Sequence, residues 1–349
     1  MAEYTYHEQV DINNTRKLRA ILDTLPRFCH DFFRGIEATT SSRTRLAYAY
    51  DLRVFFEFLK ATNPALKDTA ITDIKIDILD QIKAIDIEEY LSYLTYYKSD
   101  VKERLNKENG KKRKLVSLRS FYNYYFKKEM IKTNPASLVS VPKLHEKAII
   151  RLDVDEVARL LDEVESAQNL SKKQQQFHEK TKVRDLAIMT LLLGTGIRVS
   201  ECVGLDINDV DFENNGIKIR RKGGYEAIVY FGDEVREALL DYLEERKHMI
   251  ACDGHTNALF LSLQMKRISV RSVENLVKKY ASAVTKLKKI TPHKLRSTYG
   301  TSLYRETGDI YLVADVLGHK DVNTTRKHYA AIEDDRRRSA ANLVKLRRE

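Results

Sequence analysis

The chain has 349 residues, of which 43% are hydrophobic and 32% charged, and its formal net charge is +11. This length allows two domains, and this composition is typical of a globular protein in water. No apolar run approaches the ~20 residues of a membrane helix, and the polar N-terminus does not look like a secretory signal. We therefore expect a cytoplasmic protein with no membrane partner.

The excess of positive charge favours a polyanionic partner, because each Lys or Arg that neutralises a phosphate releases condensed counterions. A basic surface that is merely solvated is the alternative. The three cysteines, Cys29, Cys202 and Cys252, are far apart and show no CxxC spacing. This argues against a disulfide framework and against a zinc site, so we expect reduced, mostly buried thiols.

The first part of the chain has its apolar residues mainly at helical spacing, with few glycines and prolines. The pattern predicts an all-helical domain. Its clearest helices are RTRLAYAYDLRVFFEFLK (43–60), IEEYLSYLTYYK (87–98) and KKRKLVSLRSFYNYYFKK (111–128). We interpret their Tyr and Phe side chains as core residues rather than as platforms for stacked bases.

A domain boundary is expected in the stretch 134–150, where Pro135 and Pro142 interrupt the helical periodicity. We assign residues 1–141 to an N-terminal lead and a helical domain, 142–150 to a linker, and 151–349 to a second domain.

The second domain is predicted to be mostly helical with one small antiparallel sheet. Asp153 or Asp155 is a plausible cap for its first helix, residues 166–182 look like an exposed insertion, and RDLAIMTLLL reads as a buried helix that ends at the glycines 194 and 196. Alternating apolar and polar residues around Gly-Gly predict a β-hairpin over 216–231. Helical patterns then return in REALLDYLEERK (236–247), SVENLVKKYASAV (272–284) and SLYRETGDIYLVADVLG (302–318).

Four separated segments each place a cationic or proton-handling residue beside a turn or a helix start. They are GTGIRVSE (194–201), RRKGG (220–224), TPHKLR (291–296) and LGHKDVNTTRKHYA (317–330). Any one of them alone is weak evidence, because an Arg after a glycine turn is usually just exposed. Together they have the arrangement expected when scattered side chains converge on one phosphate.

These four segments, in this order, resemble the motifs of the tyrosine recombinases, a family that includes Xer proteins, phage integrases and Cre-like enzymes. The resemblance spans nearly the whole chain. It implies a helical, SAM-like core-binding domain followed by a mostly helical catalytic domain. It also implies a catalytic set with Glu201 in support, made of Arg198, Lys222, His293, Arg296, His319 and the nucleophile Tyr329.

The chemistry of these residue types fits such roles. Two planar guanidiniums, Arg198 and Arg296, can bind the nonbridging oxygens of a phosphodiester as it gains negative charge. Tyrosine is a poor nucleophile until a base or nearby cations favour its phenolate, and the leaving 5′ oxygen needs a proton. We expect Lys222 to be the acid and His293 the base or a hydrogen-bond partner. No acidic metal cage accompanies the set, so no metal and no other cofactor is expected.

The resemblance further implies double-stranded DNA as partner, a 3′-phosphotyrosine intermediate and strand exchange without ATP. In the family, four protomers on two DNA sites pass through a Holliday junction. The basic tail RRRSAANLVKLRRE (336–349) resembles the terminal helix that docks on a neighbouring protomer. A frayed basic end is the alternative reading of this tail.

The helix 111–128 resembles the core-binding helix that lies against DNA in this family. The residues that we expect to contact DNA are Lys111, Lys112, Arg113, Lys114 and Arg119, together with Arg43 and Arg45 of an earlier helix. A charged, solvated helix face is the rival interpretation, and phosphate contacts alone would not specify a site.

Two features depart from the family pattern. One residue more than usual separates His319 from Tyr329, and Ser297 stands where many relatives have a second histidine. If the loop could not absorb the extra residue, Tyr329 would miss the phosphate. Three other tyrosines nearby, Tyr299, Tyr304 and Tyr311, lie on helical segments and are expected in the core.

Within the family, the long lead, the 166–182 segment and the strings RKGG and TPHKLR look most like the solitary XerS type. This suggests resolution of chromosome or plasmid dimers, with a DNA translocase as activator. The alternatives are an integrase of a mobile element, a type IB topoisomerase that relaxes supercoils, and a DNA-binding regulator without catalytic activity.

Overall fold

The computed structural model describes residues 4–98, 103–143, 150–221, 223–319 and 322. The chain divides into two compact units, Met1–Lys147 and Ala148–Glu349, here called the N-terminal and the C-terminal unit. The division falls within the stretch 142–150. Among the described residues, no helix is both long and apolar enough to cross a membrane.

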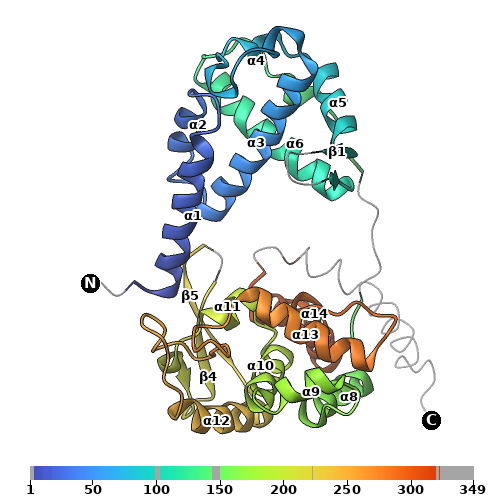
Figure 1. Cartoon of the computed structure of the whole chain (residues 1–349). Helices are drawn as coiled ribbons and strands as arrows, with labels where there is room; N and C mark the ends of the chain where they lie inside the picture. The colour runs from blue at the N-terminus through green and yellow to red at the C-terminus, as the bar shows by residue number, and fades with distance from the viewer. Residues whose placement is uncertain (1–3, 99–102, 144–149, 222, 320–321, 323–349) are drawn as a thin grey trace, which may run out of the picture. The chain divides into compact units, whose positions relative to one another are not determined.

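The N-terminal unit is built mainly from helices (Figure 1, blue to green). They are α1 (Tyr6–Leu22), α2 (Cys29–Gly35), α3 (Ser42–Thr62), α4 (Ile78–Gln81), α5 (Ala84–Tyr93), α6 (Glu108–Lys127) and α7 (Pro135–Leu138), with short 3₁₀ turns at Pro64–Leu66 and Ile71–Asp73. Helix α3 starts where Ser41 caps it, its Oγ accepting the N–H of Thr44. Helix α3 packs against α1 and α6.

The core of this unit is rich in aromatic rings. The rings of Phe32, Phe56 and Tyr125 each pack edge to face against the ring of Phe121. The Tyr125 hydroxyl donates to the carbonyl of Phe28 at 2.6 Å, so its polar end is satisfied inside the core. The interpretation of these aromatic side chains as core residues is confirmed for this cluster, whose four rings are all buried.

One part of this unit is not helical. The segment predicted as a helix over 87–98 leaves helical structure after Tyr93 and forms strand β1 (Tyr96–Lys98), which pairs antiparallel with β2 (Glu103–Leu105). The prediction of an all-helical domain was therefore wrong here. Tyr96 and Tyr97 are of a residue type that favours strands. They form a strand here because β2 pairs with them, and β2 lies beyond the segment predicted as a helix.

The C-terminal unit combines helices with a small sheet (Figure 1, green to red). Its helices are α8 (Val154–Ser166), α9 (Lys172–His178), α10 (Lys182–Thr195), α11 (Val199–Gly204), α12 (Asp233–Lys247), α13 (Val270–Val284), α14 (Pro292–Thr307) and α15 (Ile310–Leu317), with a 3₁₀ turn at Ile207–Asp209. Asp153 caps α8 in a capping box with Glu156. Helix α10 lies at the centre, packed by α8, α12 and α14, which explains the mainly apolar run from Leu186 to Leu193.

The segment 166–182 is partly packed, and not the exposed insertion that we expected. It contains α9, whose last residue His178 is 1% exposed, and Leu170 is also buried. The His178 ring nitrogen Nε2 bonds the carbonyl of Val164 at 2.7 Å. The prediction failed because most residues of the segment are polar, and composition does not show that a few of them, such as His178, point inward.

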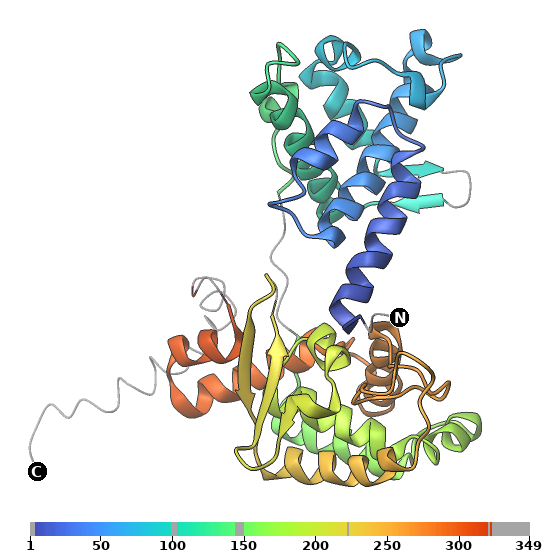
Figure 2. The same cartoon turned by 90° about the vertical axis from the view of Figure 1, so that its left-hand side faces the viewer.

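The predicted hairpin over 216–231 is confirmed. Strand β4 (Gly216–Arg220) pairs antiparallel with β5 (Glu226–Tyr230), and β3 (Val210–Asp211) adds to the other edge of β4. Gly223 and Gly224 both have positive φ, at 104° and 88°, which the turn requires. Figure 2 shows these yellow strands beside the orange-red helices α14 and α15. The mainly helical fold with small antiparallel sheets agrees with the predicted fold class.

Candidate active site

The first candidate residue stands at the junction of α10 and α11. Gly196 ends α10 with a φ of 62°, and Arg198 is the N-cap residue of α11. The Glu201 carboxylate accepts the backbone N–H of Arg198 at 2.7 Å and its guanidinium at 2.8 Å. Glu201 is buried, whereas the Arg198 side chain is 33% exposed. The carboxylate therefore holds a guanidinium that still faces solvent.

Two further candidates, His293 and Arg296, lie on the first turns of α14. Thr291 precedes the helix and Pro292 occupies its first turn, where a missing N–H costs nothing. His293 is exposed and Arg296 is buried, one helical turn apart. A buried guanidinium needs acceptors, and Arg296 finds them in the carbonyl of Gly196, at 2.6 Å, and in that of Leu317.

The C-terminal end of α15 brings these segments together. Gly318 is the C-cap with a φ of 61°, and the N–H of His319 donates to the carbonyl of Ala314 at 2.9 Å. The Arg198 guanidinium reaches the carbonyl of Gly318 at 3.4 Å, next to the Leu317 carbonyl that accepts from Arg296. Arg198, Arg296 and His319 thus meet at one helix end, although they are up to 121 residues apart in sequence.

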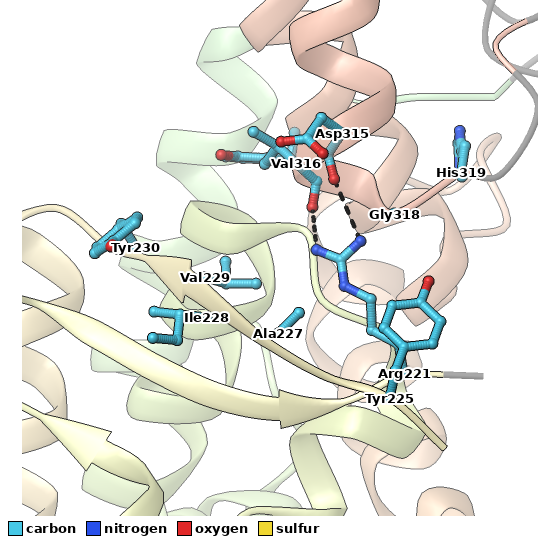
Figure 3. Close-up of a pocket in the computed structure, with 11 residues that line it drawn as sticks. Arg221, Tyr225, Ala227, Ile228, Val229, Tyr230, Asp315, Val316, Gly318 and His319 are labelled. Atoms are coloured by element: carbon cyan, nitrogen blue, oxygen red, sulfur yellow. Dashed lines mark hydrogen bonds between the residues drawn. The ribbon is translucent and has the colours of Figure 1, made fainter. Parts of the chain in front are cut away.

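Arg221 is a third arginine at this helix end, and sequence analysis did not single it out. Its guanidinium donates to the carbonyl of Val316 at 2.9 Å and to that of Asp315 at 3.3 Å (Figure 3). A sequence signal existed: residues 217, 219 and 221 point to the same face of a strand, and the first two are buried isoleucines. An arginine at the third position of that series is expected to be buried and bonded.

A cavity of about 440 Å³ lies between the hairpin and α15. Arg221, Tyr299, Gly318 and His319 line it, together with residues of β5 (Figure 3). The cavity therefore adjoins the helix end at which the arginines meet.

Lys222 and Tyr329, the candidate acid and the candidate nucleophile, lie outside the described residues. The chain neighbours of Lys222, Arg221 and Gly223, are described and belong to the hairpin turn.

The three rival tyrosines differ in their surroundings. Tyr304 is buried, as expected. Tyr299 is half-buried on the cavity wall, and burial raises the pKa of its phenol, which disfavours the phenolate. Tyr311 is 72% exposed, so its expected place in the core was wrong. It stands in the first turn of α15, and its six-residue separation from Leu317 spans about 9 Å along the helix axis.

The basic residues of the N-terminal unit fall into two groups. Lys114 is buried and its ammonium lies 3.0 Å from the Asp51 carboxylate. Arg113 bonds the same carboxylate, although its side chain is 51% exposed. Arg119 donates to the carbonyls of Ala136 and Val139. The other residues are exposed or half-buried: Arg43 is exposed, Lys111 donates to Thr95 at 2.7 Å, Arg45 bonds Glu37, and Lys112 is half-buried.

Comparison with known proteins gives the chain a family. The profile described as "Phage integrase family" matches residues 151–336. Tyrosine recombinase XerC of Caldanaerobacter subterraneus subsp. tengcongensis is 35% identical over 328 residues, which are 91% of this chain and 86% of that protein. Tyrosine recombinase XerC of Chlorobaculum tepidum is 31% identical and covers 86% of this chain and 88% of that protein.

Solved structures agree in fold. A structure of the XerH site-specific recombinase bound to its palindromic difH substrate has a TM-score of 0.64 at 21% identity, and covers 87% of this chain and 80% of that one. A lambda integrase dimer bound to a COC′ core site has a TM-score of 0.62 at 16% identity, and covers 86% and 94%. The extent of the family match and the identity to the XerC proteins decide the matter: the chain belongs to the phage integrase family of tyrosine recombinases, and is an enzyme that cleaves and rejoins DNA.

Proposed function

We propose that this enzyme recombines DNA at a specific site through a covalent bond between Tyr329 and a 3′ phosphate. The observation that carries the proposal is the meeting of Arg198 and Arg296 at the C-terminal end of α15, beside His319. Two fixed guanidiniums can bind the nonbridging oxygens of one phosphodiester, and can stabilise the extra negative charge of its transition state.

In the proposed step, the Tyr329 oxygen bonds to phosphorus and the bond from phosphorus to the 5′ oxygen breaks. His293 takes the phenol proton, and Lys222 gives a proton to the leaving 5′ oxygen. His319 donates to the phosphate. The reverse step rejoins the strands with the same residues, so the exchange needs neither a metal ion nor ATP.

At the level of the whole reaction, we propose strand exchange by four protomers through a Holliday junction, with the tail 336–349 docked on a neighbour. The relatives are named tyrosine recombinase XerC, and we propose the role that the resemblance to Xer proteins implies: resolution of chromosome or plasmid dimers, with a translocase as activator. The solitary XerS type remains our proposal for the subclass. An integrase of a mobile element is the alternative, because it would use the same catalytic set.

For the N-terminal unit, we propose that it binds double-stranded DNA. The candidates for direct contact are Arg43, Arg45, Lys111, Lys112 and Arg113, the last of which is 51% exposed while it bonds Asp51. Lys114 and Arg119 would act indirectly, because they hold α6 to its neighbours through Asp51 and through backbone carbonyls.

The test compares the wild type with Tyr329→Phe on duplexes that cover the DNA flanking the gene, each carrying a nick that traps cleaved product. We expect wild-type protein to become covalently attached at one mapped position, and Tyr329→Phe to bind the same duplex without attachment. Attachment by both proteins would assign the nucleophile to another residue. Binding without attachment by either would favour a DNA-binding regulator, and site-independent relaxation of plasmids would favour a topoisomerase.

A further inference from the structure

Three arginines from three separate elements donate to four consecutive carbonyls at the end of α15. Arg221 bonds the carbonyls of residues 315 and 316, Arg296 that of 317, and Arg198 that of 318. The last carbonyls of a helix have no partner within the helix and carry its partial negative charge. The end of α15 is therefore a common anchor for cationic side chains of the site.

Arg221 differs from the other two because its main chain also shapes the hairpin turn. Its N–H donates to the carbonyl of Tyr225 at 2.9 Å, and its own carbonyl accepts the N–H of Gly224 at 3.0 Å. The side chain is buried at 9% exposure. One residue thus ties the turn between β4 and β5 to the end of α15.

Gly318 shows how close this contact is. A Cβ atom at this position would overlap the Arg221 guanidinium, and the φ of 61° is one that other residues rarely adopt. A guanidinium that is buried and bonded to two carbonyls cannot move away without losing those bonds. The anchor therefore depends on arginine on one side and glycine on the other.

We infer that Arg221 is a positioning residue for the reaction: it ties the turn between β4 and β5 to the helix end beside His319, and it immediately precedes Lys222 in the chain. Arg221 directs its guanidinium at backbone carbonyls, so it acts through its neighbour rather than on the phosphate. The inference rests on the proposed function, in which Lys222 protonates the leaving 5′ oxygen.

The experiment uses two duplexes with the cleavage sequence mapped for the wild type, which differ only in one bridging atom, a 5′ oxygen or a 5′ sulfur at the cleaved bond. A 5′ thiol has a pKa near that of cysteine, about 8.5, so it leaves as a thiolate without a proton. Sulfur therefore restores cleavage when the acid is misplaced, and does not restore it when phosphate binding or folding is lost.

The variants are Arg221→Met, which keeps the length of the side chain, and Arg221→Lys, which keeps a cation. Arg220→Met is the matched control, because Arg220 is the preceding, exposed arginine and the last residue of β4. Gly318→Ala disturbs the same contact from the other side. Lys222→Met sets the behaviour expected when the acid itself is lost.

We expect Arg221→Met and Gly318→Ala to slow cleavage of the oxygen duplex at least ~10-fold, part of the ~10²–10⁴-fold that general acid catalysis contributes. On the sulfur duplex Arg221→Met should come within ~3-fold of the wild type, as Lys222→Met should under the same acid assignment. Gly318→Ala should be restored only in part, because it also disturbs the carbonyl that accepts from Arg198. Arg221→Lys should recover part of the loss, and Arg220→Met should behave as wild type on both duplexes.

Two results would overturn the inference: wild-type cleavage of the oxygen duplex by Arg221→Met, or an equal loss on both duplexes by a variant that melts like the wild type. Failure of the proposed function looks different. In that case sulfur would not rescue Lys222→Met, and the role given to Lys222, together with this inference, would be wrong.

Discussion

Arg198 and Glu201 are joined twice, because one carboxylate accepts both the backbone N–H of Arg198, at 2.7 Å, and its guanidinium, at 2.8 Å. The same acidic group therefore fixes where α11 starts and where the guanidinium points. Glu201 is 5% exposed, so little water competes for its oxygens. The orientation of Arg198 depends on this buried residue as much as on its own backbone.

Replacing Glu201 with glutamine should lower the rate of covalent attachment while leaving DNA affinity nearly unchanged. A hydrogen bond to a charged group contributes about 1.5–3 kcal/mol, so its loss corresponds to about 10–100-fold in rate. Attachment to the nicked duplex and gel-shift affinity would be measured on the same protein. Wild-type attachment would mean that Arg198 is held well enough without the carboxylate.

Arg198→Ala and Arg296→Ala should both reduce cleavage by about 10²–10³-fold, as expected when a donor to the transition state is removed. Their effects on stability should differ. Arg296 is buried and satisfies the carbonyls of Gly196 and Leu317, and an unsatisfied buried group costs about 1–3 kcal/mol. Arg198 is a third exposed, and its buried partner Glu201 would keep the backbone N–H of residue 198, so Arg198→Ala should lower the free energy of unfolding less than Arg296→Ala does. Equal destabilisation by the two would contradict the arrangement.

Each unit contains one fully buried cysteine, Cys29 in the N-terminal unit and Cys202 in the C-terminal unit. Burial raises the pKa of Cys202 from its ordinary value near 9 to about 12. Since the thiolate is the reactive form, a thiol reagent at pH 8 should modify Cys252 alone in the native protein. Cys202 should stay unmodified when the pH is raised to 9.

The raised pKa of Cys202 also makes the stability of the C-terminal unit depend on pH. Between pH 9 and about 12 the unfolded thiol ionises while the buried one keeps its proton, so the C-terminal unit should lose stability as pH rises through that window. Labelling of Cys29 and Cys202 across a urea series gives a separate unfolding curve for each unit. Fast modification of Cys202 in the native protein would contradict its burial.

Asp51→Asn should destabilise the N-terminal unit strongly, because it leaves the buried ammonium of Lys114 without its carboxylate. Loss of one partner of a buried ion pair typically costs about 3–5 kcal/mol. The Cys29 labelling curve should shift and the Cys202 curve should not. The double variant Asp51→Asn/Lys114→Met, which removes the orphaned charge, should recover part of the loss; no recovery would mean that the pair is not the source.

Salt dependence separates the two groups of basic residues in the N-terminal unit. Arg43→Ala should reduce the slope of log affinity against log salt by about 1, the effect of one lost phosphate contact. Lys114→Met should leave the slope unchanged, because its charge is already matched inside the protein. An unchanged slope for Arg43→Ala would remove that residue from the proposed DNA interface.

Much of the C-terminal unit could be predicted from sequence because its signals are local. A glycine with positive φ ends α10, Asp153 caps α8, and the Gly-Gly turn sets the hairpin. The two arginines and His319 that meet at α15 were recognised by the order of their motifs, not by any local pattern. A local sequence pattern cannot predict that Arg198 bonds the carbonyl of Gly318, which is 120 positions away in the chain.

The errors arose where tertiary contacts decide. Strands β1 and β2 stabilise each other by antiparallel pairing. Helical periodicity within one segment cannot reveal pairing with another segment. The 166–182 segment buries His178 and Leu170 in spite of its polar composition. Tyr311 was expected in the core for its residue type, yet it occupies the outer face of α15, where the apolar stripe is carried by Val313 and Leu317.

The acceptors at the end of α15 are backbone carbonyl oxygens, and this affects the electrostatic field of the bound guanidiniums. A carboxylate would hold a guanidinium equally well but would cancel its charge and repel an approaching anion, whereas a peptide carbonyl is a dipole with no net charge. The bonds of Arg221 and Arg296 to this helix end therefore immobilise the cations while leaving their field intact. In the proposed site, the phosphate would therefore meet in Arg296 a guanidinium that is already held in place and keeps its full charge, whereas Arg198 shares its charge with the Glu201 carboxylate.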